Sequence, residues 1–146
     1  MNKICTNKKA YFEYEVLDKY VAGIQLVGSE VKSIRDAKVS IAEAYCYFAD
    51  EEMFIKSMHV SEYKQSGKYD NHEPTRERKL LLNKKEIIKL KRGKNEKGLT
   101  IIPLAVMLTN RGLIKIEIGL CKGKKLYDKR ESLKEKDIKR DLERNI

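Results

Sequence analysis

The chain has 146 residues, of which 41% are hydrophobic and 37% are charged, and its formal net charge is +10 at pH 7. This length and apolar content suit one domain with a modest core, and the basic balance favours an acidic partner, most commonly nucleic acid. No apolar run is long enough to span a membrane and nothing resembles a signal peptide, so we expect a cytoplasmic protein without a membrane partner.

The first elements follow a basic N-terminal arm. Residues 11–27 are rich in Tyr, Val, Ile and Leu and are interrupted at Ala22-Gly23, which predicts a strand, a bend or bulge, and a second strand. Residues 28–35 have apolar positions three apart and Ser29 as a cap-like residue, so they predict a short helix that closes one barrel end.

A hairpin and a long loop are expected next. Residues 44–48 and 53–59 are short apolar runs joined by a polar turn, and they should pair antiparallel. Residues 62–77 have no apolar period and predict a long exposed loop of the kind that binds something. We interpret His59 as a packing residue at a strand end, and His72 as a residue that holds the loop or an RNA.

The second half begins with a helix over residues 83–91. Asn83 is its predicted N-cap, with Glu86 three residues on. Its predicted buried stripe is Ile87, Ile88 and Leu90. Residues 99–108 and 113–120 then form the strongest predicted strand pair, joined by a turn that contains glycine.

Six or so short strands with two helices favour a mainly β fold in so small a chain. Successive parallel strands would each need a crossover helix, so we predict an OB-like antiparallel β-barrel with flanking short helices. Three cysteines are too few and too far apart for a disulfide scaffold or a zinc knuckle. We expect Cys46 and Cys121 to be small core residues, and Cys5 to be exposed.

Positive charge is concentrated in part of the chain. Residues 76–97 hold ten Lys or Arg against three Glu, a net charge of +7. The patch is either a nucleic-acid contact or simply the solvated face of a helix. From charge and expected exposure, the candidate RNA-binding cations are Lys8, Lys9, Arg76, Arg78, Lys79 and Lys84.

The last residues form a separate basic tail. Residues 122–146 carry ten Lys or Arg and six Asp or Glu but few aliphatic anchors, so we divide the chain into a barrel at 1–122 and a tail at 123–146. The tail begins with a glycine and cations around one tyrosine, which suits phosphate contact and base stacking. These residues are Gly123, Lys124, Lys125, Tyr127, Asp128, Lys129 and Arg130. The tail either becomes helical on binding a partner or lies as a solvated helix on the barrel.

Catalytic patterns are weak. Neither histidine has a second ligand at metal-binding spacing, and no phosphate-binding loop or nucleophile motif is present. Glu13, Glu15 and Asp18 are the candidate carboxylates for a metal that cleaves phosphodiesters, but no second carboxylate set accompanies them. We therefore favour binding over catalysis, with no cofactor, no metal and no catalytic residue.

The chain also resembles the SmpB family, the small protein partners of tmRNA in bacterial ribosome rescue, along nearly its whole length. The order and spacing of six segments carry the resemblance. These segments are Asn7-Lys8-Lys9-Ala10, Ala22-Gly23, the run of residues 28–35, Met58-His59-Val60-Ser61, the run of residues 76–83, and the run of residues 123–130.

This resemblance implies a barrel that binds the tRNA-like domain of tmRNA and stands in for a missing anticodon arm. It implies a C-terminal tail that enters the vacant mRNA channel near the decoding centre of the small ribosomal subunit and becomes helical there. Elongation factor Tu on the alanyl-tmRNA complex is a further implied partner. By position, Leu81 and Asn83 belong to the tmRNA-binding surface and residues 128–130 to the ribosome-facing tail. Val21 departs from the glutamate that many members have.

Three functions are therefore compared. The first is a non-enzymatic tmRNA-binding adaptor, the second a ribosomal protein or translation factor that binds rRNA constitutively, and the third an OB-barrel nuclease. The adaptor is distinguished from a constitutive rRNA-binding protein by a tail that is needed on the ribosome but not for tmRNA binding. The nuclease is identified by RNA cleavage in the presence of Mg²⁺ or Ca²⁺.

Overall fold

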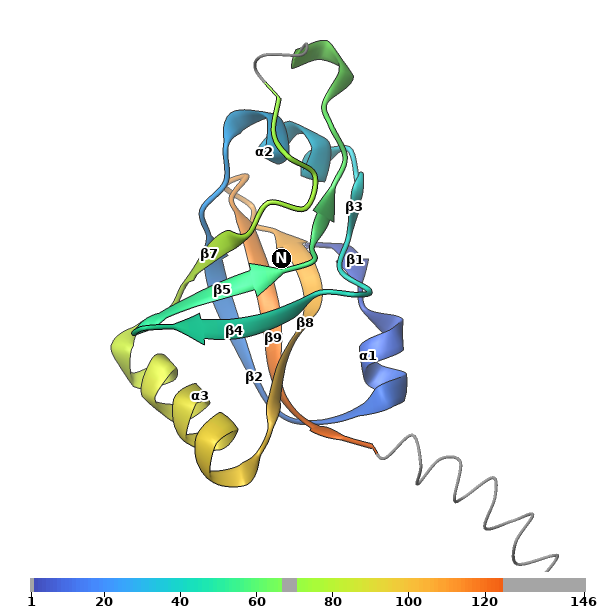
Figure 1. Ribbon diagram of the computed structural model, residues 1–146. Helices are drawn as coiled ribbons and strands as arrows, with labels where there is room; N and C mark the ends of the chain where they lie inside the picture. Colours follow the sequence, from blue (N-terminus) through green and yellow to red (C-terminus); the bar gives the residue numbers. More distant parts are fainter. Residues whose placement is uncertain (1, 67–70, 125–146) are drawn as a thin grey trace, which may run out of the picture.

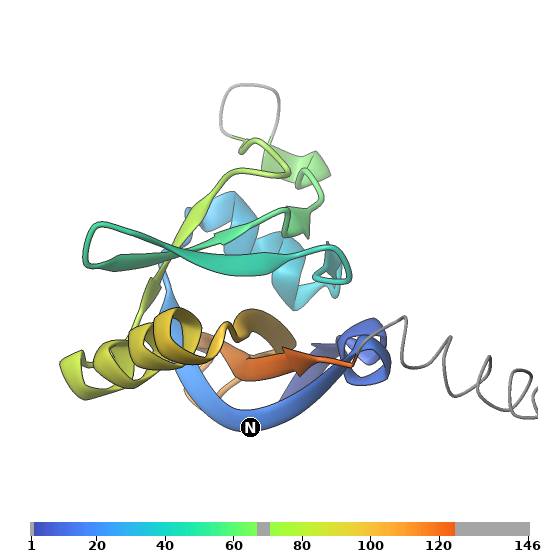
Figure 2. The ribbon, with the colours of Figure 1, turned by 60° about the horizontal axis from the view of Figure 1, so that its bottom comes forward.

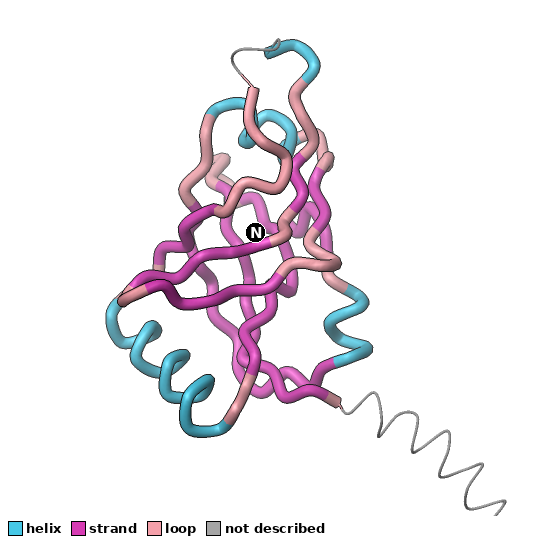
Figure 3. Tube along the Cα trace, viewed as in Figure 1, coloured by secondary structure: helices cyan, strands magenta, loops and turns pink. Residues whose placement is uncertain are grey.

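An antiparallel sheet that closes on itself forms the body of the protein. The computed structural model describes residues 2–66 and 71–124. The strands lie in the order β1-β8-β4-β5-β7-β2-β9, and an additional pairing of β8 with β9 closes the ring (Figure 1). The predicted OB-like antiparallel barrel with short helices is confirmed, and Figure 3 shows the strands of this ring in magenta.

The described elements have the following bounds. The strands are β1 (Asn2–Thr6), β2 (Tyr14–Ile24), β3 (Val39–Ser40), β4 (Tyr45–Ala49), β5 (Glu52–Lys56), β6 (His59–Val60), β7 (Arg78–Leu81), β8 (Thr100–Leu108) and β9 (Ile114–Gly123). The helices are α1 (Lys8–Glu13), α2 (Gly28–Arg35), α3 (Lys84–Lys97) and one 3-10 turn, η1 (Lys64–Ser66).

The strand pair β8 and β9 is the centre of the fold, as predicted. β8 is buried along nearly its whole length because it lies between two apolar layers. Ile101 and Val106 belong to the core inside the barrel, whereas Ile102 and Leu104 pack on the other side with Ala10 of α1. Burial on both faces explains why the sequence of β8 is a continuous apolar run rather than an alternating one.

The N-terminal residues do not form an arm, contrary to the prediction. β1 pairs with β8, and α1 follows because Asn7 caps it. The buried Asn7 side chain accepts a hydrogen bond from the Ala10 N–H (3.1 Å) and donates to the carbonyl oxygens of Ile41 (3.1 Å) and Pro103 (2.9 Å). An amide buried with all three bonds satisfied fixes α1 against the barrel.

The prediction of two strands in residues 11–27 is also wrong. After α1, a single strand β2 continues through Ala22 and Gly23 and pairs with β9 along its length. Its irregularity is a bulge between Val16 and Asp18 rather than a bend at the glycine. A glycine inside a strand indicates either a bulge or a close approach by a neighbour. Gly23 is a case of close approach, because the Leu81 side chain lies directly beside it.

Helix α2 has the predicted bounds but a different cap. The N-cap position is Val27, whose N–H donates to the Glu30 carboxylate (2.9 Å). Ser29 is not the cap, because its hydroxyl is 2.8 Å from Nδ1 of His72. The Nε2 of His72 is 2.8 Å from the Val60 carbonyl oxygen, which only accepts, so Nε2 is the donor nitrogen. His72 therefore holds the loop against α2, as one of our two interpretations expected, while His59 is exposed rather than packed.

Helix α3 lies at the other end of the barrel from α2 (Figures 1 and 2). It begins after Asn83 as predicted and runs past residue 91, ending at Gly98 in the left-handed conformation (φ 62°). Leu90 is fully buried, but Ile88 is 51% exposed, contrary to the predicted stripe. A glycine in place of a side chain lets α3 approach the sheet, because a Cβ at Gly93 would lie 2.5 Å from Leu120.

The hairpin of β4 and β5 and the core positions of two cysteines are confirmed. Tyr45 pairs with Lys56 at the open end of the hairpin. Burial raises the pKa of Cys121 to about 11 and also raises the pKa of Cys46, so both remain thiols near neutral pH. Cys5 is half-buried rather than exposed.

Candidate nucleic-acid interface

The junction between β7 and α3 presents an apolar side chain, an amide and cations next to one another. Leu81 is 46% exposed at the end of β7, and Asn83, Lys84 and Lys85 are exposed just after it. The Asn83 side-chain oxygen accepts from the Glu86 N–H (2.9 Å), and the Asn83 N–H donates to the Glu86 carboxylate (3.1 Å). These bonds fix the junction, and neither uses the Asn83 NH₂ group, which is a donor suited to a base edge or a phosphate.

A cation from β9 joins this junction because Gly23 has no side chain. Gly23 pairs with Leu81 on one side and with Lys115 on the other. A Cβ built at Gly23 would lie 3.3 Å from Cβ of Leu81 and 3.7 Å from Nζ of Lys115. Sequence reasoning missed Lys115, which is isolated in the sequence, and only the register of β2 between β7 and β9 brings it here.

The middle and last turns of α3 form a positive groove against β2. The groove has a volume of about 180 Å³, and Lys89, Arg92 and Lys97 line it from α3. Asp18 and Tyr20 face them from β2, and the Tyr20 hydroxyl donates to Asp18 (2.8 Å). Burial and this hydrogen bond raise the pKa of Tyr20 to about 12. Three cations against one carboxylate leave the groove positive, which suits a phosphate.

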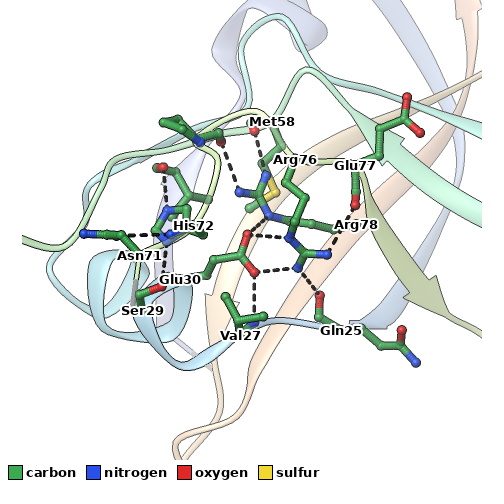
Figure 4. Close-up of polar contacts among 12 residues, drawn as sticks. Gln25, Val27, Ser29, Glu30, Met58, Asn71, His72, Arg76, Glu77 and Arg78 are labelled. Atoms are coloured by element: carbon green, nitrogen blue, oxygen red, sulfur yellow. Dashed lines mark hydrogen bonds and ion pairs between the residues drawn. The ribbon is translucent and has the colours of Figure 1, made fainter. Parts of the chain in front are cut away.

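Arg78 does not belong to this surface, and the expected exposure on which its selection as an RNA-binding cation rested is wrong. Alternation along β7 turns Lys79 and Leu81 outward and Arg78 inward, where its side chain is fully buried. Its guanidinium pairs with Glu30 and donates to the carbonyl oxygens of Met58 (2.8 Å) and Pro74 (3.1 Å) (Figure 4). Burial lowers the pKa of Arg78, and the hydrogen bond to Glu30 opposes that shift.

The same carboxylate holds a second arginine. Arg76 Nη2 lies 2.6 Å from Glu30 Oε1, so Glu30 lies between the two guanidinium groups (Figure 4). Burial alone would raise the pKa of Glu30, but hydrogen bonds from Arg76, the Val27 N–H and Arg78 outweigh it, and the pKa is lowered. The three residues join the end of the long loop to α2.

Two predicted cations already have protein partners. Arg76 is partly exposed and also donates to the Gln25 carbonyl oxygen (3.4 Å). Lys79 is 3.0 Å from Glu52. Exposed ion pairs contribute little and exchange readily, so both assignments remain predictions. Lys84 takes part in none of the ion pairs among the described residues, and its assignment likewise remains a prediction.

A second basic region lies on the other side of the barrel. Lys8 and Lys9 are exposed on α1, where Lys9 is 2.7 Å from Glu43, and Figures 1 and 2 both show α1 far from α3. The structure thus does not bring these lysines together with Leu81. Instead they lie on α1, the helix whose last residue, Glu13, accepts a hydrogen bond from the Lys124 N–H through its carbonyl oxygen (2.9 Å).

The beginning of the predicted tail is part of the barrel. Gly123 is the last residue of β9 and pairs with Tyr14, and Lys124 Nζ donates to the Tyr11 carbonyl oxygen (3.0 Å). The remaining predicted tail residues lie outside the described residues. They are Lys125, Tyr127, Asp128, Lys129 and Arg130.

The carboxylates considered for a nuclease do not gather. Within residues 2–66 and 71–124, no three His, Cys, Asp or Glu side chains are placed to hold a metal ion. Glu13, Glu15 and Asp18 therefore do not form a metal centre. In the same residues, no helix has the length and apolar character needed to cross a membrane.

The protein is a closed, basic β-barrel, and one junction on it presents an exposed apolar residue, an amide and several cations. These features place it in the class of small RNA-binding β-barrel proteins.

The comparison with known proteins gives the family. The family model of the SmpB protein matches residues 4–146, and the chain belongs to this family. It is 57% identical over 138 residues to the SsrA-binding protein of Cytophaga hutchinsonii, covering 94% of this chain and 90% of that one. It is 55% identical over 146 residues to the SsrA-binding protein of Acholeplasma laidlawii, covering 100% and 97% of the two chains.

A solved structure agrees in fold. A chain of a solved structure described as "tmRNA-SmpB: a journey to the center of the bacterial ribosome" matches this chain with a TM-score of 0.71 and 38% sequence identity. The match covers 88% of this chain and 93% of that chain. The family resemblance noted from the sequence is confirmed.

Proposed function

We propose that this protein is a tmRNA-binding adaptor that rescues stalled ribosomes by trans-translation. The observation that carries the proposal is the identity of about half of all residues to SsrA-binding proteins, over nearly the whole chain. The adaptor binds and positions RNA and has no catalytic residue or cofactor. It works in the cytoplasm, with tmRNA and the ribosome as its partners.

The β7–α3 junction is the part of the barrel that we assign to the tRNA-like domain of tmRNA. Leu81 offers an apolar contact to a base or ribose, and the Asn83 NH₂ group offers a hydrogen-bond donor. Lys84 and Lys115 lie beside them, and the groove cations farther along α3 supply further phosphate contacts. A fixed, mixed surface of this kind selects the shape of one RNA better than dispersed charge does.

The second basic region serves the ribosome in this proposal. The barrel, which in the structure continues through Gly123 and Lys124, holds tmRNA, and the rest of the predicted tail enters the vacant mRNA channel near the decoding centre of the small subunit. The exposed Lys8 and Lys9 lie on the side of the barrel where the tail begins, which supports a division of contacts between two sides. Elongation factor Tu on the alanyl-tmRNA complex is a further proposed partner.

The competing function is constitutive binding to rRNA. The adaptor and an rRNA-binding protein would both use basic surfaces, so charge alone does not distinguish them. Selective binding of tmRNA over other RNAs does distinguish them. The nuclease alternative has lost its candidate site, because its three carboxylates do not come together among the described residues.

The test is binding of the full chain, and of a chain ended at Lys124, to the tRNA-like domain of tmRNA over a series of salt concentrations. An unrelated structured RNA of equal length is the control. We expect both chains to prefer the tRNA-like domain, because the junction lies in the barrel. Equal affinity for the two RNAs would refute the adaptor function and favour general rRNA binding.

A further inference from the structure

Three aromatic side chains form a row on the outer face of the β4–β5 hairpin. Tyr45 and Tyr47 alternate with inward residues of β4, and Phe54 lies on β5 directly opposite Tyr47. The ring centroids of Tyr45 and Tyr47 are 6.5 Å apart, and those of Tyr47 and Phe54 are 5.9 Å apart with planes inclined by 27°. Tyr45 is 40% exposed and the other two are half-buried, so ring surface remains open to solvent.

Lysines alternate with these rings across the strands. Lys56 pairs with Tyr45 across β4 and β5, and Lys79 pairs with Phe54 across β5 and β7. Lys56 is 3.9 Å from Glu77 and Lys79 is 3.0 Å from Glu52, and both carboxylates are about half exposed. Such pairs are weak in water, so a phosphate can replace either carboxylate.

The row is continuous with the β7–α3 junction. Lys79 and Leu81 are two residues apart on one strand and therefore share the outer face of β7. β7 lies between β5 and β2, so the outer surface runs from Tyr45 to Gly23 without a break in pairing. In Figure 1 this face of β4 and β5 is turned toward the viewer, and no helix crosses it.

We propose that Tyr45, Tyr47 and Phe54 form a platform on which unpaired RNA nucleotides stack while Lys56 and Lys79 contact their phosphates. The inference rests on the proposed function in one respect, that the nucleotides belong to the RNA bound at the junction. Rings in a row beside cations are the arrangement that single-stranded nucleic acids require, since every base has a face to stack. The alternation of lysines with the rings favours a phosphate-bearing partner over a protein partner, for which charged residues are depleted at the interface centre.

The platform is pre-formed, which limits the entropy lost on binding. The Tyr47 hydroxyl donates to Glu77, and the ring stacks on Phe54, so its orientation is set before RNA arrives. Removal of one stacking ring typically weakens single-strand binding by about tenfold, with a range from roughly fivefold to somewhat over a hundredfold.

The test measures binding of a single-stranded RNA hexamer that contains 2-aminopurine, whose fluorescence falls when the base stacks. We expect the full-length protein and Tyr47→Phe to quench the probe, and Tyr47→Ala and Phe54→Ala to bind it about tenfold more weakly with an unchanged salt slope. Tyr63→Ala, which removes a half-buried ring beside Lys32 outside the row, is the matched control and should behave like the unchanged protein. Thermal unfolding of each variant checks that the barrel is intact.

Two results overturn the platform. One is hexamer binding by Tyr47→Ala equal to that of the unchanged protein, and the other is equal loss in Tyr63→Ala. The tRNA-like domain of tmRNA, tested in parallel, separates this inference from the proposed function. If hexamer binding depends on the rings but the protein shows no selectivity for tmRNA, the platform is supported and the adaptor function is refuted. If the protein is selective for tmRNA but hexamer binding does not depend on the rings, the adaptor function is supported and the platform is refuted.

Discussion

Replacing Arg78 by methionine removes the only fully buried guanidinium among the described residues while keeping a side chain of similar length. The change leaves the Glu30 carboxylate buried with fewer donors, and it also takes donors from the carbonyl oxygens of Met58 and Pro74. Because Arg78 faces the core, we expect a loss of stability and no direct loss of RNA affinity.

The magnitude follows from what stays in place. Removing one partner of a buried ion pair costs about 3–5 kcal/mol. Glu30 keeps Arg76 at 2.6 Å and the Val27 N–H at 2.9 Å, so its charge is not left without partners. We therefore expect the lower end, about 3 kcal/mol, which lowers the melting temperature by about 10 °C in a domain of this size.

The matched control is Lys79→Met, one residue along the same strand. Lys79 faces outward and its ion pair with Glu52 is partly exposed, so its loss should change stability by less than about 1 kcal/mol. If Lys79 contacts a phosphate, its loss reduces the slope of log affinity against log salt by about one.

Urea unfolding and RNA binding over a salt series, done on both variants, give opposite expected patterns. Arg78→Met should lower the free energy of unfolding and leave the slope of log affinity against log salt unchanged. Lys79→Met should leave the free energy of unfolding nearly unchanged and reduce that slope. A reduced salt slope with unchanged stability for Arg78→Met would show that this arginine reaches RNA, and the argument from burial would be refuted.

Three further outcomes are expected. Leu81→Ala should weaken binding to the tRNA-like domain of tmRNA by roughly 1–2 kcal/mol, the transfer energy of a partly exposed leucine, without changing the salt slope; an altered slope measured in the same titration would mean that it acts indirectly. Alanine at Asp128, Lys129 and Arg130 together should spare tmRNA binding and abolish tagging of stalled chains, and normal tagging in a translation assay would refute the tail assignment. The pKa of Glu30 is lowered in the folded protein, so its carboxylate stabilises the fold fully above the unfolded pKa of about 4.3, and this stabilisation is lost as pH falls through the folded pKa. In Glu30→Gln, the free energy of unfolding should therefore depend less on pH below about pH 4. The same pH dependence in acid unfolding of the variant and the unchanged protein would contradict the shift.

Elements with a local signal were predictable from the sequence. Asn83 and Glu86 form a capping box whose spacing alone defines a helix start, and the structure has both of its hydrogen bonds. The β8–β9 pair was predictable because its apolar runs are long and a glycine turn joins them. Strand β7 was not predicted, and the exposure of Leu81 follows from the alternation along it.

The errors concern features that depend on distant residues. Arg78 lies in a basic run like its neighbours, and only the tertiary fold brings Glu30, 48 residues earlier, to its guanidinium. Asn7 caps α1 through the Ala10 N–H, and carbonyl oxygens 34 and 96 residues away hold the Asn7 side chain in that position. Lys115 joins the junction through strand register, which periodicity does not determine.

Lys124 sets where the tail departs. Its main-chain and side-chain nitrogens bind two carbonyl oxygens of α1, so the last described residue is tied to the barrel rather than joined to it by a loose linker. The distance between the β7–α3 junction and the origin of the tail is consequently a fixed dimension of the folded body. If RNA binds at the junction and the tail reaches the ribosome, the barrel therefore sets the distance between the two contacts. An insertion directly after Lys124 would lengthen the path from that fixed point while leaving both surfaces chemically unchanged.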